Sequence, residues 1–181
     1  NQNLRHKRFN QSNKDLRKDK LRTRDVIFDK KFYIYLPLSI TAPFISTGLM
    51  FHQIFIINQK GWTLDMLATG YIFLGIFSII GLIFGGPIID KFDTKKMNMF
   101  TLLPLFISLF VLLLFDSYFS MFVYLSLLGI NWGITTPFVG SLWAELYDLS
   151  SLGTVKALLH ACSVFASALS PLIFGYVIDI G

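Results

Sequence analysis

Five long apolar stretches alternate with short polar segments along this chain. A helix needs about 20 mainly apolar residues to cross ~30 Å of hydrocarbon, and runs of this length exceed an ordinary strand. Inside lipid, backbone amides must be bonded within the segment itself, which favours helices. We therefore predict an all-α polytopic membrane protein with five transmembrane helices, at about residues 32–57, 64–89, 97–115, 119–147 and 154–178.

Basic residues are concentrated at one end of the chain. Residues 1–31 contain eleven of the sixteen Lys and Arg, against four Asp. If this tail is cytoplasmic, the segments on that side carry fifteen basic residues and the opposite side carries only Lys60, as the positive-inside rule requires. We expect Trp62 and Trp143 to anchor opposite interfaces. The sequence thus predicts an integral protein of the cell (inner) membrane, with residues 1–31 as a basic cytoplasmic linker and residues 32–181 as the transmembrane domain.

The basic tail has two possible partners. Nucleic acid is the usual alternative for such a tail. We do not expect nucleic acid here, because the tail leads directly into an apolar span; a juxtamembrane basic segment instead rests on anionic lipid. The bilayer is therefore the expected partner.

Small residues distinguish some spans from others. The second span has Gly81 and Gly85, and the fourth has Gly129 and Gly133 at the same spacing of four. Such pairs allow two helix backbones to approach closely. We expect the second, fourth and fifth spans to pack inside a bundle. The third span is mostly Leu and Phe and is expected to face lipid.

Two short strings recur along the chain in the same order. Residues 40–45, Ile-Thr-Ala-Pro-Phe-Ile, resemble residues 134–139, Ile-Thr-Thr-Pro-Phe-Val, and residues 86–90 resemble residues 175–179. Three spans separate the copies, so their orientations in the membrane are opposite. This pattern indicates an inverted-topology repeat, which is common in secondary transporters. The alternative is chance matching in a biased composition.

The polar loop after the second span carries an unusual charge. Asp90 lies near the carboxyl end of its own helix, where the helix dipole disfavours an anion. We therefore expect a cation or another helix N-terminus to stabilise it, and Gly86 to allow close approach. Lys91, Lys95 and Lys96 suit both the helix end and the inner lipid surface. The alternative is an ordinary positive-inside loop.

This loop resembles a signature of the major facilitator superfamily, Gly-x-x-x-Asp-Arg/Lys-x-Gly-x-Arg/Lys-Arg/Lys. The positions that the signature specifies correspond to Gly86, Asp90, Lys91, Lys95 and Lys96, while Asp93 stands where the signature usually has Gly. Residues 140–153 and 167–179 resemble the tenth and eleventh helices of bacterial members. The resemblance covers about residues 24–181 and implies the C-terminal half, helices seven to eleven, of a twelve-helix transporter. The start without Met and the end inside a span also lead us to expect a fragment.

The resemblance implies secondary transport by alternating access between two helical halves, with helices seven and ten lining the cavity. The expected partners are a small organic solute, a proton or ion as a candidate coupled species, the bilayer and the missing N-terminal half. A transporter-like sensor or scaffold is the first alternative. A polytopic membrane enzyme is a weaker one, because the chain has no Gly-x-Ser-x-Gly, His-Glu-x-x-His or intramembrane carboxylate pair. No catalytic residue, metal or cofactor is expected.

Polar residues within the spans are the candidates for the site, because such side chains face protein or a water-filled cavity. His52 and Gln53 could contact solute, and His52 could couple a proton; interhelical hydrogen bonding is the alternative. Asn131 and Trp132 suit a solute site, since an amide hydrogen-bonds and an indole stacks; packing is again the alternative. Near the inner end of the fourth span, Glu145 is expected to pair with Lys156, with titration during coupling as the alternative.

Overall fold

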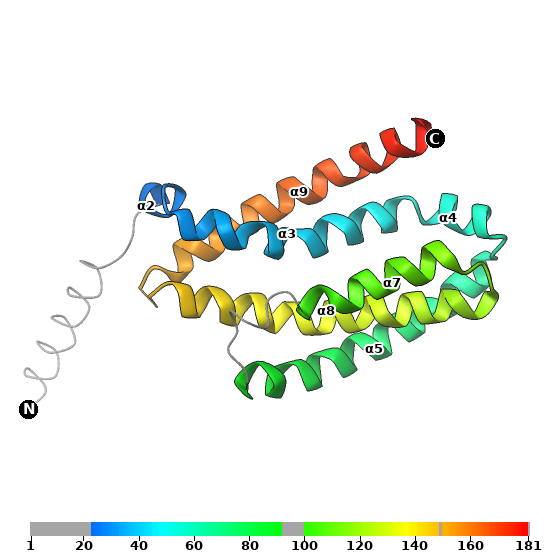
Figure 1. Cartoon of the computed structure of the whole chain (residues 1–181), viewed down its shortest axis with the longest axis horizontal. Coiled ribbons are helices and arrows are strands. Elements are labelled where there is room, and N and C mark those ends of the chain that lie inside the picture. The colour runs from blue at the N-terminus through cyan, green and yellow to red at the C-terminus, as the bar shows by residue number, and fades with distance from the viewer. Residues whose placement is uncertain (1–22, 92–99, 149, 181) are drawn as a thin grey trace, which may run out of the picture.

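The computed structural model describes residues 23–91, 100–148 and 150–180, without the side chains of residues 89 and 90 (Figure 1). Every regular element in these ranges is a helix, which confirms the all-α fold class. The elements in chain order are α2 (Thr23–Ile27), α3 (Lys30–Phe51), α4 (Gln53–Lys60), α5 (Leu64–Lys91), the 3₁₀ turn η1 (Phe100–Leu102), α7 (Leu103–Leu114), α8 (Tyr118–Leu146) and α9 (Leu152–Ile180).

Four of the described helices, α3, α5, α8 and α9, are long and apolar enough to cross a membrane. The third predicted span corresponds to a shorter apolar helix, Phe100–Leu114, and its predicted first residues lie outside the described ranges. Pro104 lies in the first turn of α7, where a missing N–H costs no helical hydrogen bond.

The first predicted span is interrupted rather than continuous. α3 ends at Phe51, and His52 leaves the helical conformation with ψ of 14° before α4 begins at Gln53. The imidazole Nδ1 of His52 lies 2.9 Å from the carbonyl oxygen of Gly48, which also accepts the His52 backbone N–H. Both the backbone N–H and the side chain of His52 thus lie within hydrogen-bond distance of the Gly48 carbonyl. α4 then ends at Gly61, whose φ of 65° suits a residue without a side chain.

The helices run alternately in direction, so their ends form two groups (Figure 1). One group, here the α2 end, contains α2, the carboxyl ends of α5 and α8 and the start of α9. The other, here the Trp62 end, contains α4 and the α7–α8 turn. α8 is central: it packs most extensively on α5, then on α7, and more sparsely on α3, which instead pairs with α9. Two subassemblies result, α3–α9 and α5–α7–α8.

Glycines bring α5 and α8 into direct backbone contact. A Cβ atom at Gly133 would lie 2.2 Å from the carbonyl oxygen of Ser78, and one at Gly81 would lie 2.6 Å from that of Ile130. Gly129 is equally tight, with a backbone oxygen 2.3 Å from the added Cβ. The predicted close approach is therefore confirmed, and the two glycine pairs face each other across one interface.

The two outer helices expose much of their surface. α7 buries Leu105 and Ser108 and exposes Phe106, Phe110 and Leu113, as expected for a helix that faces lipid. α9 was expected inside a bundle. In the described chain it packs along α3 and buries few side chains, so most of its surface is open. Packing of α9 on both sides would need structure beyond this part of the chain.

Candidate functional site

An open cavity of about 530 Å³ lies between α3 and α8. Its lining is mainly apolar, with four hydroxyl side chains. The lining residues are Ala42, Pro43, Ser46, Thr47, Met50 and Phe51 from α3 and Trp132, Thr135 and Thr136 from α8. A mostly apolar pocket with a few polar groups is the usual form of a small-molecule site.

The cavity lies between the two recurrent strings. Ala42 and Pro43 come from the string at residues 40–45, and Thr135 and Thr136 come from the string at residues 134–139. The recurrence was the sequence signal that could have identified these lining residues, since it marks equivalent positions on two helices.

Trp132 is held in one orientation at the wall of this cavity. Its indole Nε1 donates a hydrogen bond of 2.9 Å to Ser46 Oγ across the α3–α8 contact. Three turns further along α8, Trp143 Nε1 donates to Ser39 Oγ at 3.1 Å. These bonds satisfy both indole N–H groups, which a partly buried tryptophan requires. Trp143 is completely buried, so the prediction that it anchors at the interface is wrong.

Asn131 does not line the cavity, although it precedes Trp132. Its side chain is completely buried, and Nδ2 donates a 2.9 Å hydrogen bond to the carbonyl oxygen of Thr101 in η1. Consecutive helical residues point about 100° apart, so the two neighbours face different helices. Asn131 thus joins α8 to η1, the interhelical alternative considered for it.

His52 and Gln53 lie beyond Phe51 and outside the lining of the cavity between α3 and α8. The His52 ring stacks on Phe174 of α9, with centroids 6.2 Å apart and planes inclined by 24°. The side-chain oxygen of Gln53 accepts a hydrogen bond from the Tyr71 hydroxyl of α5. Both residues therefore connect the α3–α4 break to neighbouring helices. Their contact with solute stays a prediction.

The predicted gating loop is only partly described. Gly86 lies within α5, and a Cβ atom there would meet nothing within 4 Å. Lys91 is exposed at the last residue of α5. Lys95, Lys96 and the side chain of Asp90 lie outside the described residues, so their roles stay predictions.

Glu145 lines a second, polar cavity of about 440 Å³ at the α2 end. Its other polar lining residues are Asp29, Lys31, Tyr147 and Asp148. Lys156 is exposed early in α9 and is not part of this lining. The predicted pairing of Glu145 with Lys156 stays a prediction.

Asp29 joins three elements beside this polar cavity. One carboxylate oxygen accepts the Lys31 backbone N–H at 2.9 Å and caps α3, and the other accepts the Tyr147 hydroxyl at 2.9 Å. Burial raises the pKa of Tyr147 above its ordinary value, and the hydrogen bond to Asp29 adds to this. The Tyr147 hydroxyl is therefore a donor throughout the neutral range.

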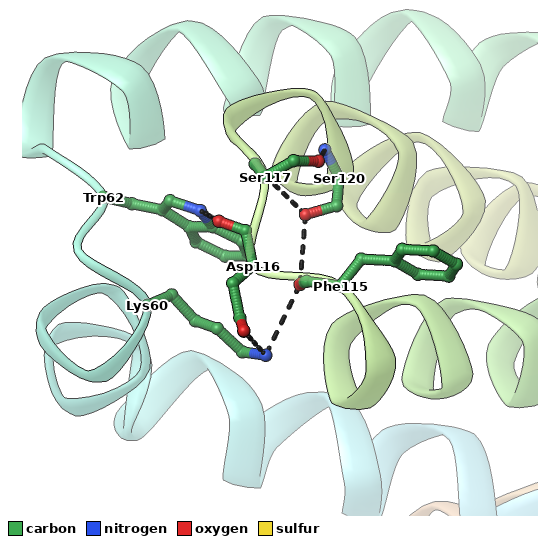
Figure 2. A network of polar contacts seen from close by, with 6 residues as sticks. All are labelled: Lys60, Trp62, Phe115, Asp116, Ser117 and Ser120. Carbon is green, nitrogen blue, oxygen red and sulfur yellow. Dashed lines mark hydrogen bonds and ion pairs between the residues drawn. The ribbon is translucent and has the colours of Figure 1, made fainter.

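The Trp62 end is closed by a separate polar network that sequence reasoning did not foresee (Figure 2). Lys60 Nζ lies 2.5 Å from Asp116 Oδ1 and 3.4 Å from the carbonyl oxygen of Phe115. Trp62 Nε1 donates to the Asp116 carbonyl at 3.2 Å, and Ser120 Oγ donates to the Phe115 carbonyl at 3.2 Å. The network ties the end of α4 to the α7–α8 turn. Trp62 is buried there, so its expected role as an exposed interfacial anchor is wrong.

Comparison with known proteins gives one match. A family model for the Major Facilitator Superfamily matches residues 4–180, nearly the whole chain. Comparisons with curated proteins and with solved structures give no match.

Proposed function

The chain belongs to the Major Facilitator Superfamily, a superfamily of membrane transporters, and from that premise we propose that it moves a small organic solute by alternating access. It is an integral membrane protein. The loop at residues 86–96 and the stretches at 140–153 and 167–179 support its assignment to the C-terminal half, with the basic tail in the cytoplasm. A coupled proton or ion and a partner N-terminal half belong to the same proposal.

The observation that supports this proposal best is the cavity between α3 and α8. The indole of Trp132 offers a flat apolar face whose orientation is fixed by Ser46. The hydroxyls of Thr47 and Thr136 border the same space. A solute with an apolar face and hydrogen-bonding groups at its edge would match this wall.

The position of the cavity also suits a moving site. It lies at the boundary between the α3–α9 pair and the α5–α7–α8 group, where packing is sparser than inside either. Alternating access requires helices that change their separation around a fixed site. Sparse packing with two tryptophan–serine hydrogen bonds allows such a change at lower cost than the glycine interface of α5 and α8 would.

Transport by the full-length protein in proteoliposomes tests the proposal. A panel of small organic solutes is offered outside the vesicles, and uptake is measured by mass spectrometry of the vesicle contents. For any solute that is taken up, we expect Trp132→Ala to reduce uptake by at least about ten-fold, since it removes a large part of the wall. Phe110→Ala is the matched control, because Phe110 is an exposed aromatic on α7.

Two different results would contradict two different parts of the proposal, the transport activity and the place of the solute site. Solute binding without any flux through a folded full-length protein would favour the sensor or scaffold alternative. Flux that Trp132→Ala leaves unchanged would keep the transporter but move its site away from this cavity. A membrane-impermeant thiol reagent on Thr136→Cys, in a Cys162→Ser background, checks whether water reaches the cavity wall.

A further inference from the structure

The corner between α2 and α3 exposes an aromatic side chain beside a cation. Phe28 is 75% exposed, although it is a large apolar residue at the end of a bundle. The guanidinium carbon of Arg24 lies 5.8 Å from the centroid of the Phe28 ring, within cation–π range. Lys30, two residues further along, is also exposed. The corner therefore presents one aromatic ring and two cations to its surroundings.

The corner is held firmly to the bundle by its other side. Val26 and Phe32 are almost completely buried and pack in one cluster with Trp143 and Val155. Asp29 caps α3 and accepts the Tyr147 hydroxyl, as described above. The exposed residues are therefore presented by an anchored turn, and the exposure of Phe28 is a property of the fold.

Arg24 and Lys30 differ from Lys31 in their position relative to the polar cavity. Lys31 lines the polar cavity with Glu145 and Asp148, so its charge is directed toward that acidic surface. Arg24 and Lys30 do not line that cavity. In the sequence, residues 1–31 carry eleven basic residues against four acidic ones, and this excess is complementary to an anionic surface.

We propose that Arg24, Phe28 and Lys30 form a binding surface for anionic lipid headgroups at the α2 end of the bundle. The Phe28 ring enters the interfacial layer, where aromatic side chains are favoured. The Arg24 guanidinium donates two parallel N–H groups to a lipid phosphate, and the Lys30 ammonium adds a second charge. The membrane thus covers the apolar surface that water would leave exposed.

Fluorescence of the full-length protein in lipid nanodiscs tests the position of the ring. Phe28→Trp keeps an aromatic side chain, and wild-type protein supplies the background from the native tryptophans. We expect the additional emission of the variant to be quenched most strongly by lipids brominated close to the headgroup. Absence of quenching at any bromine depth would overturn the proposal and would instead indicate that protein or water surrounds position 28.

Titration with phosphatidylglycerol in mild detergent, followed by native mass spectrometry, tests the two charges. We expect Arg24→Gln and Lys30→Gln each to weaken phosphatidylglycerol binding by about five-fold, since one basic residue near an anionic surface contributes about that factor. Lys156→Gln is the matched control: it removes another exposed charge at the same end of the bundle, and we expect no more than a small change. Equal losses in all three variants, or none in the first two, would overturn the proposal.

Discussion

Replacing Gly133 with alanine tests how α5 and α8 hold together. In a helix interior, alanine is favoured over glycine by about 1 kcal/mol, so helix propensity alone predicts stabilisation. At Gly133, however, the added Cβ would lie 2.2 Å from the Ser78 carbonyl oxygen and 2.6 Å from the Leu82 backbone nitrogen. Backbone atoms cannot rotate away as a side chain does. The two helices must therefore move apart.

The size of that movement sets the expected loss. Ordinary van der Waals contact begins near 3.4 Å, so the 2.2 Å contact requires a separation of about 1 Å. A gap of that width removes about a quarter to a half of the dispersion energy of each contact at the crossing. Overpacking of this kind costs about 1–3 kcal/mol. After the gain in helix propensity of about 1 kcal/mol is subtracted, we expect Gly133→Ala to be destabilised by up to about 2 kcal/mol, or up to about 8 °C in Tm.

Gly140 provides the control on the same helix. It lies seven residues after Gly133, and a Cβ atom there would meet nothing within 4 Å. We expect Gly140→Ala to leave Tm unchanged or raise it. Thermal unfolding of the full-length protein in detergent, followed by near-ultraviolet circular dichroism, measures both variants. Equal Tm values for Gly133→Ala and Gly140→Ala would refute the reasoning, and Gly81→Ala against Gly75→Ala repeats the comparison on α5.

Three further predictions concern the polar contacts at the two ends. Asp116→Asn should lower Tm only slightly, by the equivalent of less than about 1 kcal/mol, because the Asp116 side chain is 79% exposed, and high salt should remove the difference. Trp62→Phe should cost more, about 1–2 kcal/mol by denaturant unfolding, because it deletes the indole N–H and leaves the Asp116 carbonyl without this donor, while Lys60 still holds the carboxylate. Tyr147→Phe should lower stability by about 1.5 kcal/mol at neutral pH through the lost bond to Asp29. In the folded protein the pKa of Tyr147 is raised above 10.0. The contribution of the Tyr147 hydroxyl to stability is therefore present below pH 10.0 and is lost as the pH rises further. Tm measured between about pH 8 and 11 should accordingly fall less steeply in Tyr147→Phe than in the wild type.

The sequence predicted where the helices lie better than it predicted which neighbour each helix face meets. Run length sufficed to place a helix at each predicted span, and the spacing of Gly129 and Gly133 identified the tight contact of α8. Run length could not show the break at His52, because histidine is compatible with a helix. Trp143 was misassigned because an aromatic residue near a span end suits an interface and a core equally well.

The residues of the candidate site also show that the sequence does not determine which face of a helix meets which neighbour. Asn131 and Trp132 are adjacent polar positions at mid-span, and nothing in their spacing separates them. Their roles differ because α8 contacts several elements, so neighbouring directions around it meet different neighbours. Asn131 meets η1, whereas Trp132 meets Ser46 and the cavity. Only the rotation of α8 about its axis decides this, and the apolar residues on most faces of α8 leave that rotation undetermined in the sequence.

The two faces of α8 explain how one helix can serve both stability and movement. Toward α5, Gly129 and Gly133 remove side chains, so backbones touch and small shifts are costly. Toward α3, Trp132 and Trp143 keep the backbones apart. Each indole donates one hydrogen bond to a serine of α3, and Trp143 also packs against Phe32. A change in the α3–α8 distance must break or stretch these two bonds, but it leaves the glycine interface intact. The cavity therefore lies on a side of α8 where the packing is much sparser than it is toward α5 or α7.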